Sequence, residues 1–357
     1  MPETSAILIQ NIFHMLCYAF RILRQRNYQD IATEDFAHVH DMLSAILYRG
    51  ISQQLKQGLY RSYVSVEEQS ETVRGKLDLY KTKQLQAKKI RQADCTHDEF
   101  SADNELNRII KATCLSLLSC AEVSQKQKAD LRRVYPFFST ISDVALNTVR
   151  WNRLQYHRNN RSYEMLINIC YMIWQSLLPS TANGKTHFSL FDEDSMPRLY
   201  EKFILEYYRR HFPSLRASDK AIQWDIPEDT EPNMIRLLPG MHSDITLSCH
   251  GLTKIIDAKF YKHSLSSYMD KQMLHSANIY QIYTYVKNED NTGSGNVSGL
   301  LLYARTTDET QPFMSVTMGK NKIEVDSLDL NRSFSEIANT LDSIVFGCFG
   351  ASISKVD

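Results

Sequence analysis

The chain has 357 residues, of which 43% are hydrophobic and 23% charged, and its formal net charge is zero. This length has room for two domains with a core each, and the composition is that of an ordinary globular protein. The charge balance excludes a uniformly basic nucleic-acid binder, and no apolar run approaches the length of a membrane span, so no membrane association is expected.

The first half of the chain is predicted to be mainly helical. Apolar residues recur at three- and four-residue spacing over 9–23, 105–118 and 162–178, and the last of these segments stops at a proline, Pro179. Residues 63–67 and 72–79 are predicted to form a small strand pair, and the basic tract 81–91 is interpreted as a solvated face. Asp103 or Asn104 is expected to cap the helix that follows.

The second half is predicted to mix helices and strands. A helix is expected over 196–210 and a long one over 267–287. Strands are expected at 221–224, 244–248, 254–260, 299–303 and 313–318. The fold class is therefore α+β or α/β, with one domain over 1–160 and another, built on a mixed sheet flanked by helices, over 161–357.

Neither the cysteines nor the single glycine-lysine-threonine run is interpreted as a functional site. The seven cysteines are scattered without a C-x-x-C pair, which favours reduced thiols in the cytoplasm over disulfides or a zinc site. Gly184-Lys185-Thr186 lacks the upstream glycine of a phosphate-binding loop, so this chain is expected to bind no nucleotide itself.

The informative segment runs from 241 to 262, where two strand-like runs flank His250-Gly251, a plausible two-residue turn. Such a turn pairs residues whose numbers sum to 501, which places Asp244 directly opposite Asp257. Lys259 lies two residues further along and therefore on the same face of the sheet. The register predicts two carboxylates and an ammonium gathered at one place.

This trio predicts a divalent metal site. Two close carboxylates repel each other unless a cation lies between them, and hard oxygen ligands without His or Cys favour Mg²⁺, with Mn²⁺ as a possible substitute. The Ala258 carbonyl is expected as a third ligand, and Glu201, on the preceding helix, is expected to reach the metal directly or through water. Gln281, which shares a helical face with Tyr285, is expected to contact the lysine or a DNA phosphate.

Several blocks, in the same order, resemble McrC, the nuclease subunit of the McrBC system that restricts DNA carrying modified cytosine. The blocks are IQNIFHMLCYAF (9–20), RGKLDLYKT (74–82), DEFSADNELNRIIKAT (98–113), LYEKFI (199–204), SDITL (243–247), IDAKFYK (256–262) and NIYQIYTY (278–285). The resemblance covers nearly the whole chain. It implies a PD-(D/E)XK nuclease fold for the second half, with Asp244, Asp257 and Lys259 at the catalytic positions and a requirement for Mg²⁺.

The resemblance also implies partners. In this family the amino-terminal half, here 1–160, docks into the ring of an McrB-type AAA+ GTPase and stimulates GTP hydrolysis, and the complex acts on double-stranded DNA. On that basis Arg108 and Lys111 are candidates to face the ring. Two alternatives stay open: a non-cleaving GTPase activator or scaffold, and a stand-alone RecB-like repair nuclease.

Overall fold

The structure is a computed structural model that describes residues 8–20, 36, 38–177, 179–180, 187–188, 195–227, 229–261, 263–268, 271–351 and 353–356. The chain divides into two compact units, one made of Met1–Thr33 with Phe191–Asp357 and the other of Glu34–Leu190. The predicted Gly184-Lys185-Thr186 loop lies outside the described residues. In the described part of the chain, no helix is long and apolar enough to cross a bilayer.

This division differs from the predicted domain 1–160, because the helical unit both begins later, at Glu34, and ends later, at Leu190. Helix α1 (Ile9–Ala19) packs on α8 (Ser195–His211) and so belongs to the second half of the chain. The Asn11 amide donates to the Leu330 and Arg332 carbonyls, and the Tyr18 hydroxyl bonds to His211 Nε2 over 2.8 Å. Helix α7 (Arg161–Leu177) packs instead on α3 (Val39–Gln57) and α5 (Glu105–Ser119) of the helical unit. An apolar stripe shows that a helix is buried, but it does not show against which partner.

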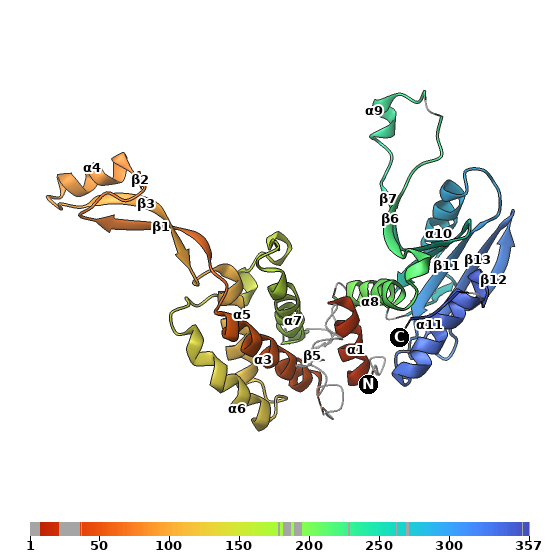
Figure 1. Ribbon diagram of the computed structural model, residues 1–357, viewed down its shortest axis with the longest axis horizontal. Coiled ribbons are helices and arrows are strands. Elements are labelled where there is room, and N and C mark those ends of the chain that lie inside the picture. The colour runs from red at the N-terminus through yellow and green to blue at the C-terminus, as the bar shows by residue number, and fades with distance from the viewer. Residues whose placement is uncertain are drawn as a thin grey trace. The chain divides into compact units, whose positions relative to one another are not determined.

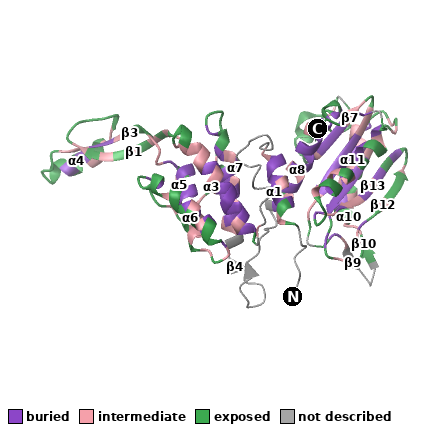
Figure 2. Cartoon of the chain, turned by 60° about the horizontal axis from the view of Figure 1, so that its bottom comes forward, coloured by how far each residue is buried: buried purple, intermediate pink, exposed green. Residues whose placement is uncertain are grey.

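Helices form the body of the unit Glu34–Leu190. They are α3 (Val39–Gln57), α5 (Glu105–Ser119), α6 (Gln125–Val134) and α7, with short 3₁₀ turns at Tyr135–Phe138, Leu146–Thr148 and Trp151–Arg153. Figure 2 shows buried residues along the sides of α3, α5 and α7. The helices predicted at 105–118 and 162–178 are confirmed within a residue or so.

Polar residues at the start of α5 are used inside this unit. Asn104, rather than Asp103, caps α5 by accepting from the Asn107 amide. Asp103 instead forms a two-pronged pair with Arg108, with distances of 2.7 and 2.9 Å. Lys111 is buried and donates to the Ile141 carbonyl over 2.6 Å. The side chains of Arg108 and Lys111 are therefore engaged by contacts within the chain, which argues against the expectation that they face the GTPase ring.

A small sheet extends from these helices (Figure 1). It contains β1 (Ser62–Ser70), β2 (Lys76–Leu77) and β3 (Ala93–Ser101) in the order β1-β3-β2, with α4 (Leu79–Ala87) between β2 and β3. The predicted pairing of 63–67 with 72–79 is wrong, because β1 pairs along its whole length with β3. Part of the basic tract 81–91 is helical in α4, whose first turn is capped by the Asp78 side chain. The cap stabilises a helix that the charge pattern did not indicate.

The other unit is built on a six-stranded mixed sheet in the order β12-β13-β11-β8-β7-β6. Its strands are β6 (Ser218–Ile222), β7 (Met241–Cys249), β8 (Leu252–Lys259), β11 (Val297–Ala304), β12 (Met314–Met318) and β13 (Asn321–Leu328). Strands β8, β11 and β13 run parallel, and the remaining neighbours are antiparallel. The predicted mixed sheet flanked by helices is confirmed.

Three helices pack on this sheet. Helix α10 (Ser276–Glu289) places Ile282 and Val286 in a core with Ile255, Leu301 and Ile323. Helix α8 contacts the strands through Tyr200, whose ring packs edge-on against Phe260. Helix α11 (Phe334–Phe349) is joined to α8 by the Tyr207 hydroxyl, which donates to Asp342 over 2.7 Å. The sequence predictions omitted β13 and α11, and placed the start of α10 too early, since part of that stretch forms the short strands β9 (Ser266–Tyr268) and β10 (Lys271–Met273).

Remaining short elements are α9 (Pro232–Ile235), η6 (Pro213–Leu215), β4 (Pro179–Ser180) and β5 (His187–Phe188). Helix α9 lies at the tip of the long connection between β6 and β7, which projects from the sheet in Figure 1.

Candidate active site

The β7–β8 hairpin has the turn and the register that the sequence predicts. His250 and Gly251 have φ values of 49° and 77°, the left-handed conformation at both central positions of a tight hairpin turn. Pairs run from Cys249 with Leu252 to Ile245 with Ile256, and each pair of numbers sums to 501. In this register, the next pair after Ile245 and Ile256 would be Asp244 with Asp257.

At that position the backbone ladder stops and a side chain takes its place. The last backbone pair is Ile245 with Ile256, and Asp244 Oδ2 accepts a hydrogen bond from the Ala258 amide over 2.8 Å. The strands thus part just where the carboxylates lie. Asp244 does not face Asp257 as a regular cross-strand pair; its carboxylate lies against the peptide that joins Asp257 to Ala258.

Asp257 is the most unusual group in this region, because it is only 1% exposed. Neither of its carboxylate oxygens has a hydrogen-bond partner among the described residues. Lys259 Nζ lies 2.7 Å from Oδ2 and forms an ion pair with it. A buried carboxylate in such surroundings is costly unless a further cationic group completes its coordination.

Electrostatic interactions tie four side chains together. Burial, the charge of Asp257 and the charge of Glu201 raise the pKa of Asp244 to about 8. Burial also raises the pKa of Glu201, with Lys259 opposing the rise and Asp257 adding to it. Burial by itself lowers the pKa of Lys259, but the Asp257 and Asp244 carboxylates outweigh it, so the pKa is raised. Glu201, Asp244, Asp257 and Lys259 are therefore near enough to share one electrostatic environment.

Helix α10 supports the lysine from the other side. Lys259 Nζ donates to Gln281 Oε1 over 3.2 Å, and Gln281 Nε2 donates to the Tyr285 hydroxyl over 2.9 Å. Tyr285 is buried, so it fixes the orientation of the Gln281 amide and turns its oxygen towards the ammonium. Of the two contacts expected for Gln281, with the lysine or with a DNA phosphate, the structure contains the one with the lysine.

The donor set suits a hard divalent cation. A bound cation would add a partner for the buried Asp257 carboxylate, and it would relieve the carboxylate repulsion that, together with burial, raises the Asp244 pKa. Within the described ranges, no three His, Cys, Asp or Glu side chains come close enough together to hold a metal by themselves. The candidate ligands are thus two carboxylates and the Ala258 carbonyl, with Glu201 placed further out.

Sequence reasoning missed a second hydrogen-bonded group beside the lysine. Tyr303 of β11 is the parallel neighbour of Lys259, and its hydroxyl accepts from Asn278 Nδ2 over 2.8 Å. The Tyr261 hydroxyl in turn donates to Asn278 Oδ1 over 3.3 Å. Asn278 precedes Gln281 by three residues and so shares its helical face, which is the signal that could have identified it.

Comparison with known proteins shows the family to which the chain belongs. A family model described as "McrBC 5-methylcytosine restriction system component" matches residues 4–304, which include every side chain of the site. The chain belongs to the McrBC family. The Escherichia coli (strain K12) "Type IV methyl-directed restriction enzyme EcoKMcrBC" is 28% identical to it over 303 residues, covering 84% of this chain and 87% of the relative.

Two solved structures from Thermococcus gammatolerans are also similar to this McrBC-family chain. An assembly of McrB AAA+ hexamers with bound McrC aligns over 94% of this chain and 76% of its own, with 16% identity and a TM-score of 0.45. The cryo-EM structure of an McrBC complex aligns over 59% of this chain and 60% of its own, with 19% identity and a TM-score of 0.38.

Proposed function

We propose that this chain is the DNA-cleaving subunit of a cytoplasmic, GTP-dependent restriction complex that acts on DNA containing modified cytosine. The reaction is Mg²⁺-dependent hydrolysis of a phosphodiester bond at a PD-(D/E)XK-type site. The observation that carries the proposal is the buried Asp257 carboxylate, for which the described residues supply no hydrogen-bond partner, next to Asp244 and Lys259. Membership of the McrBC family and the similar restriction enzyme support it.

Each side chain of the site has a role in this reaction. Asp244, Asp257 and the Ala258 carbonyl would hold Mg²⁺, which when bound polarises the scissile phosphate and lowers the pKa of a water ligand. Lys259 stabilises the negative charge that develops on the phosphate and orients the attacking water. Gln281 holds the lysine in place, and Tyr285 holds Gln281. Glu201 acts through a water molecule at the edge of the site.

The same proposal includes a partner that hydrolyses GTP. The solved McrBC relatives contain McrB AAA+ hexamers with bound McrC, and we extend that pairing to this chain. In place of the predicted region 1–160 we assign partner binding to the unit Glu34–Leu190, because α1 is packed against α8 in the other unit and α7 belongs to the helical unit. That unit, with its projecting β1–β3 sheet, is the part of the chain that we assign to binding the GTPase ring and stimulating it.

The two alternatives explain less of the molecule. A scaffold without cleavage activity has no need for a buried carboxylate pair in which burial and mutual repulsion raise the Asp244 pKa to about 8. A stand-alone repair nuclease would not need the helical unit, yet the family match begins at residue 4 and includes that unit.

The decisive experiment is plasmid cleavage by this chain together with the GTPase of its own McrBC system, Mg²⁺ and GTP. Asp257→Ala and Lys259→Ala should each lower cleavage of methylated plasmid by at least about 100-fold, while GTP hydrolysis by the complex is retained. Asp225→Asn, at an exposed aspartate of the same unit, is the matched control and should cleave normally. EDTA should stop cleavage and Mn²⁺ should restore it. Normal cleavage by either site variant would refute the assignment.

A further inference from the structure

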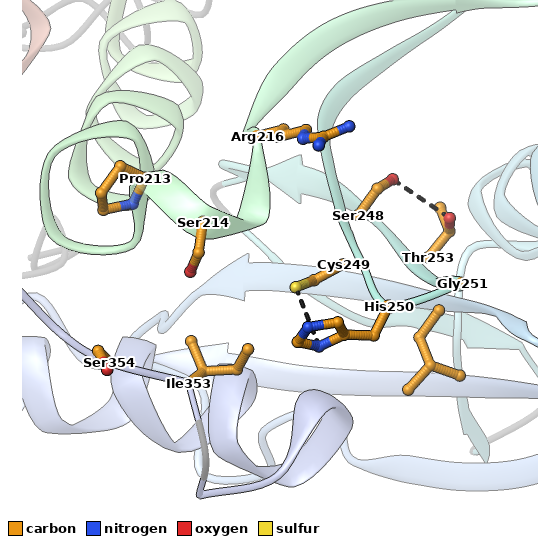
Figure 3. A pocket seen from close by; sticks show the side chains of 11 residues that line it. Pro213, Ser214, Arg216, Ser248, Cys249, His250, Gly251, Thr253, Ile353 and Ser354 are labelled. Carbon is orange, nitrogen blue, oxygen red and sulfur yellow. Dashed lines mark hydrogen bonds between the residues drawn. The ribbon is translucent and has the colours of Figure 1, made fainter.

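A pocket of about 640 Å³ lies at the turn end of the β7–β8 hairpin, away from the site described above. Its lining includes Ser214, Arg216, Ser248, Cys249, His250 and Ser354. In Figure 3 the Cys249 thiol and the His250 ring face Ser214 and Ile353 across the pocket, and Arg216 extends along the rim towards Ser248. Leu252, in this lining, is separated from Asp257 by five strand positions, roughly 17 Å along β8.

The described lining carries the positive charge of Arg216. Among the described residues no Asp or Glu lines the pocket, and none forms an ion pair or a hydrogen bond with the Arg216 guanidinium. Ser214 and Ser354 add hydroxyls that are likewise uncommitted within the described ranges. His250 adds an imidazole, whose Nδ1 lies 3.4 Å from Cys249 Sγ. Such a set of donors matches an oxyanion.

The backbone at Arg216 is also unusual. Arg216 has a φ of 48°, in the left-handed region that favours glycine, and it directly follows the short helix η6. Backbone strain of this kind is commonly retained where it directs a side chain to a functional position. At Arg216 it holds a long cationic side chain at the rim of the pocket.

We propose that this pocket binds a phosphate group through Arg216, His250 and the surrounding hydroxyls. The guanidinium can donate two parallel hydrogen bonds to phosphate oxygens, and the serine hydroxyls can donate to the others. The pocket volume leaves room for a phosphate that is part of a larger molecule, either the backbone of DNA or a nucleotide di- or triphosphate. The proposal does not depend on DNA cleavage by this chain.

The pocket contains its own reporter in Cys249, which is partly exposed. Its rates of alkylation by iodoacetate, an anion, and by iodoacetamide, which is neutral, are measured by mass spectrometry on the full chain in EDTA. The ratio of the two rates should be higher at Cys249 than at Cys120 and Cys348, the other partly exposed cysteines. Arg216→Ala should lower the ratio at Cys249 alone, by only a few-fold, because water weakens the attraction of one unit charge for the anionic reagent.

Two further variants control for folding and for charge. Arg216→Gly relieves the left-handed backbone while removing the charge, so it should reproduce the loss of anion preference in a folded protein. Arg332→Ala removes an exposed arginine of the same unit outside the pocket and should leave the ratio unchanged. An unchanged ratio in both Arg216 variants would overturn the proposal.

The source of the phosphate is then identified by protection of Cys249 from iodoacetamide. Protection by pyrophosphate and by GDP indicates a free nucleotide, and protection by a short DNA duplex alone indicates the nucleic-acid backbone. Either kind of protection should disappear in Arg216→Gly. If none of these probes slows alkylation at Cys249, the pocket is not a phosphate site, whatever the cleavage assays show.

Discussion

Replacing Asp244 by asparagine should stabilise the protein in the absence of metal while removing its activity. Burial and the neighbouring Asp257 and Glu201 carboxylates raise the Asp244 pKa from 3.8 to about 8. A carboxyl whose pKa is higher in the folded state binds more protons there than in the unfolded state, so the free energy of unfolding falls as pH rises from about 4 to about 8. Asparagine is always neutral, and its side-chain oxygen can still accept from the Ala258 amide.

The size of the effect follows from the pKa interval. At pH 7 about 3 pH units of that interval have been crossed, which at 1.36 kcal/mol per unit sets an upper bound of about 4 kcal/mol. The repulsion is shared among three carboxyls, and neutralising one of them leaves the others to readjust. We therefore expect Asp244→Asn to raise the free energy of unfolding by roughly 2 kcal/mol at pH 7, with a smaller gain at pH 5.

Urea unfolding of both proteins in EDTA at pH 5 and pH 7 measures this difference, with Asp225→Asn as an exposed control that should leave stability unchanged. Adding Mg²⁺ should then stabilise the unaltered protein and not Asp244→Asn, because only the former keeps the full ligand set. If Asp244→Asn is no more stable than the unaltered protein at pH 7, or gains as much at pH 5 as at pH 7, the electrostatic account of the site is refuted.

Three further predictions test the surroundings of the site. Gln281→Leu removes the acceptor for Lys259 and should lower cleavage by roughly tenfold without changing stability, with Tyr280→Phe on the exposed side of α10 as control. Gly299→Ala adds a Cβ only 2.7 Å from Ile282 Cγ1, so thermal unfolding should show a loss of about 1–3 kcal/mol. Asp290 is 6% exposed, and although burial raises its pKa, hydrogen bonds from Ser294, Asn321 and Gly295 lower it to about 2. The ionised Asp290 carboxylate therefore contributes at most about 2 kcal/mol to the free energy of unfolding at pH 7, and this contribution is lost as the pH falls from about 4 to 2. Asp290→Ala should remove this pH dependence of stability, as measured by urea titrations across the same range.

The local parts of this protein could be predicted from the sequence, because they depend on residues that are near one another in the chain. The His250-Gly251 turn and the two-residue repeat of a strand are sufficient to define the β7–β8 register, and the register places Asp244, Asp257 and Lys259 together. The spacing of Gln281 and Tyr285 similarly placed both on one face of α10.

Tertiary structure decided the features that depend on distant segments. Three contacts join residues that lie far apart in the chain, so that no local sequence pattern predicts them. They are the packing of α1 on α8, the pairing of β1 with β3, and the hydrogen bond between Asn278 and Tyr303. The burial of the Asp257 carboxylate, away from any hydrogen-bond partner among the described residues, likewise depends on distant segments. Periodicity and turn chemistry determine which way a side chain points, whereas its desolvation, and hence its pKa and its affinity for a cation, depends on what the whole fold packs around it.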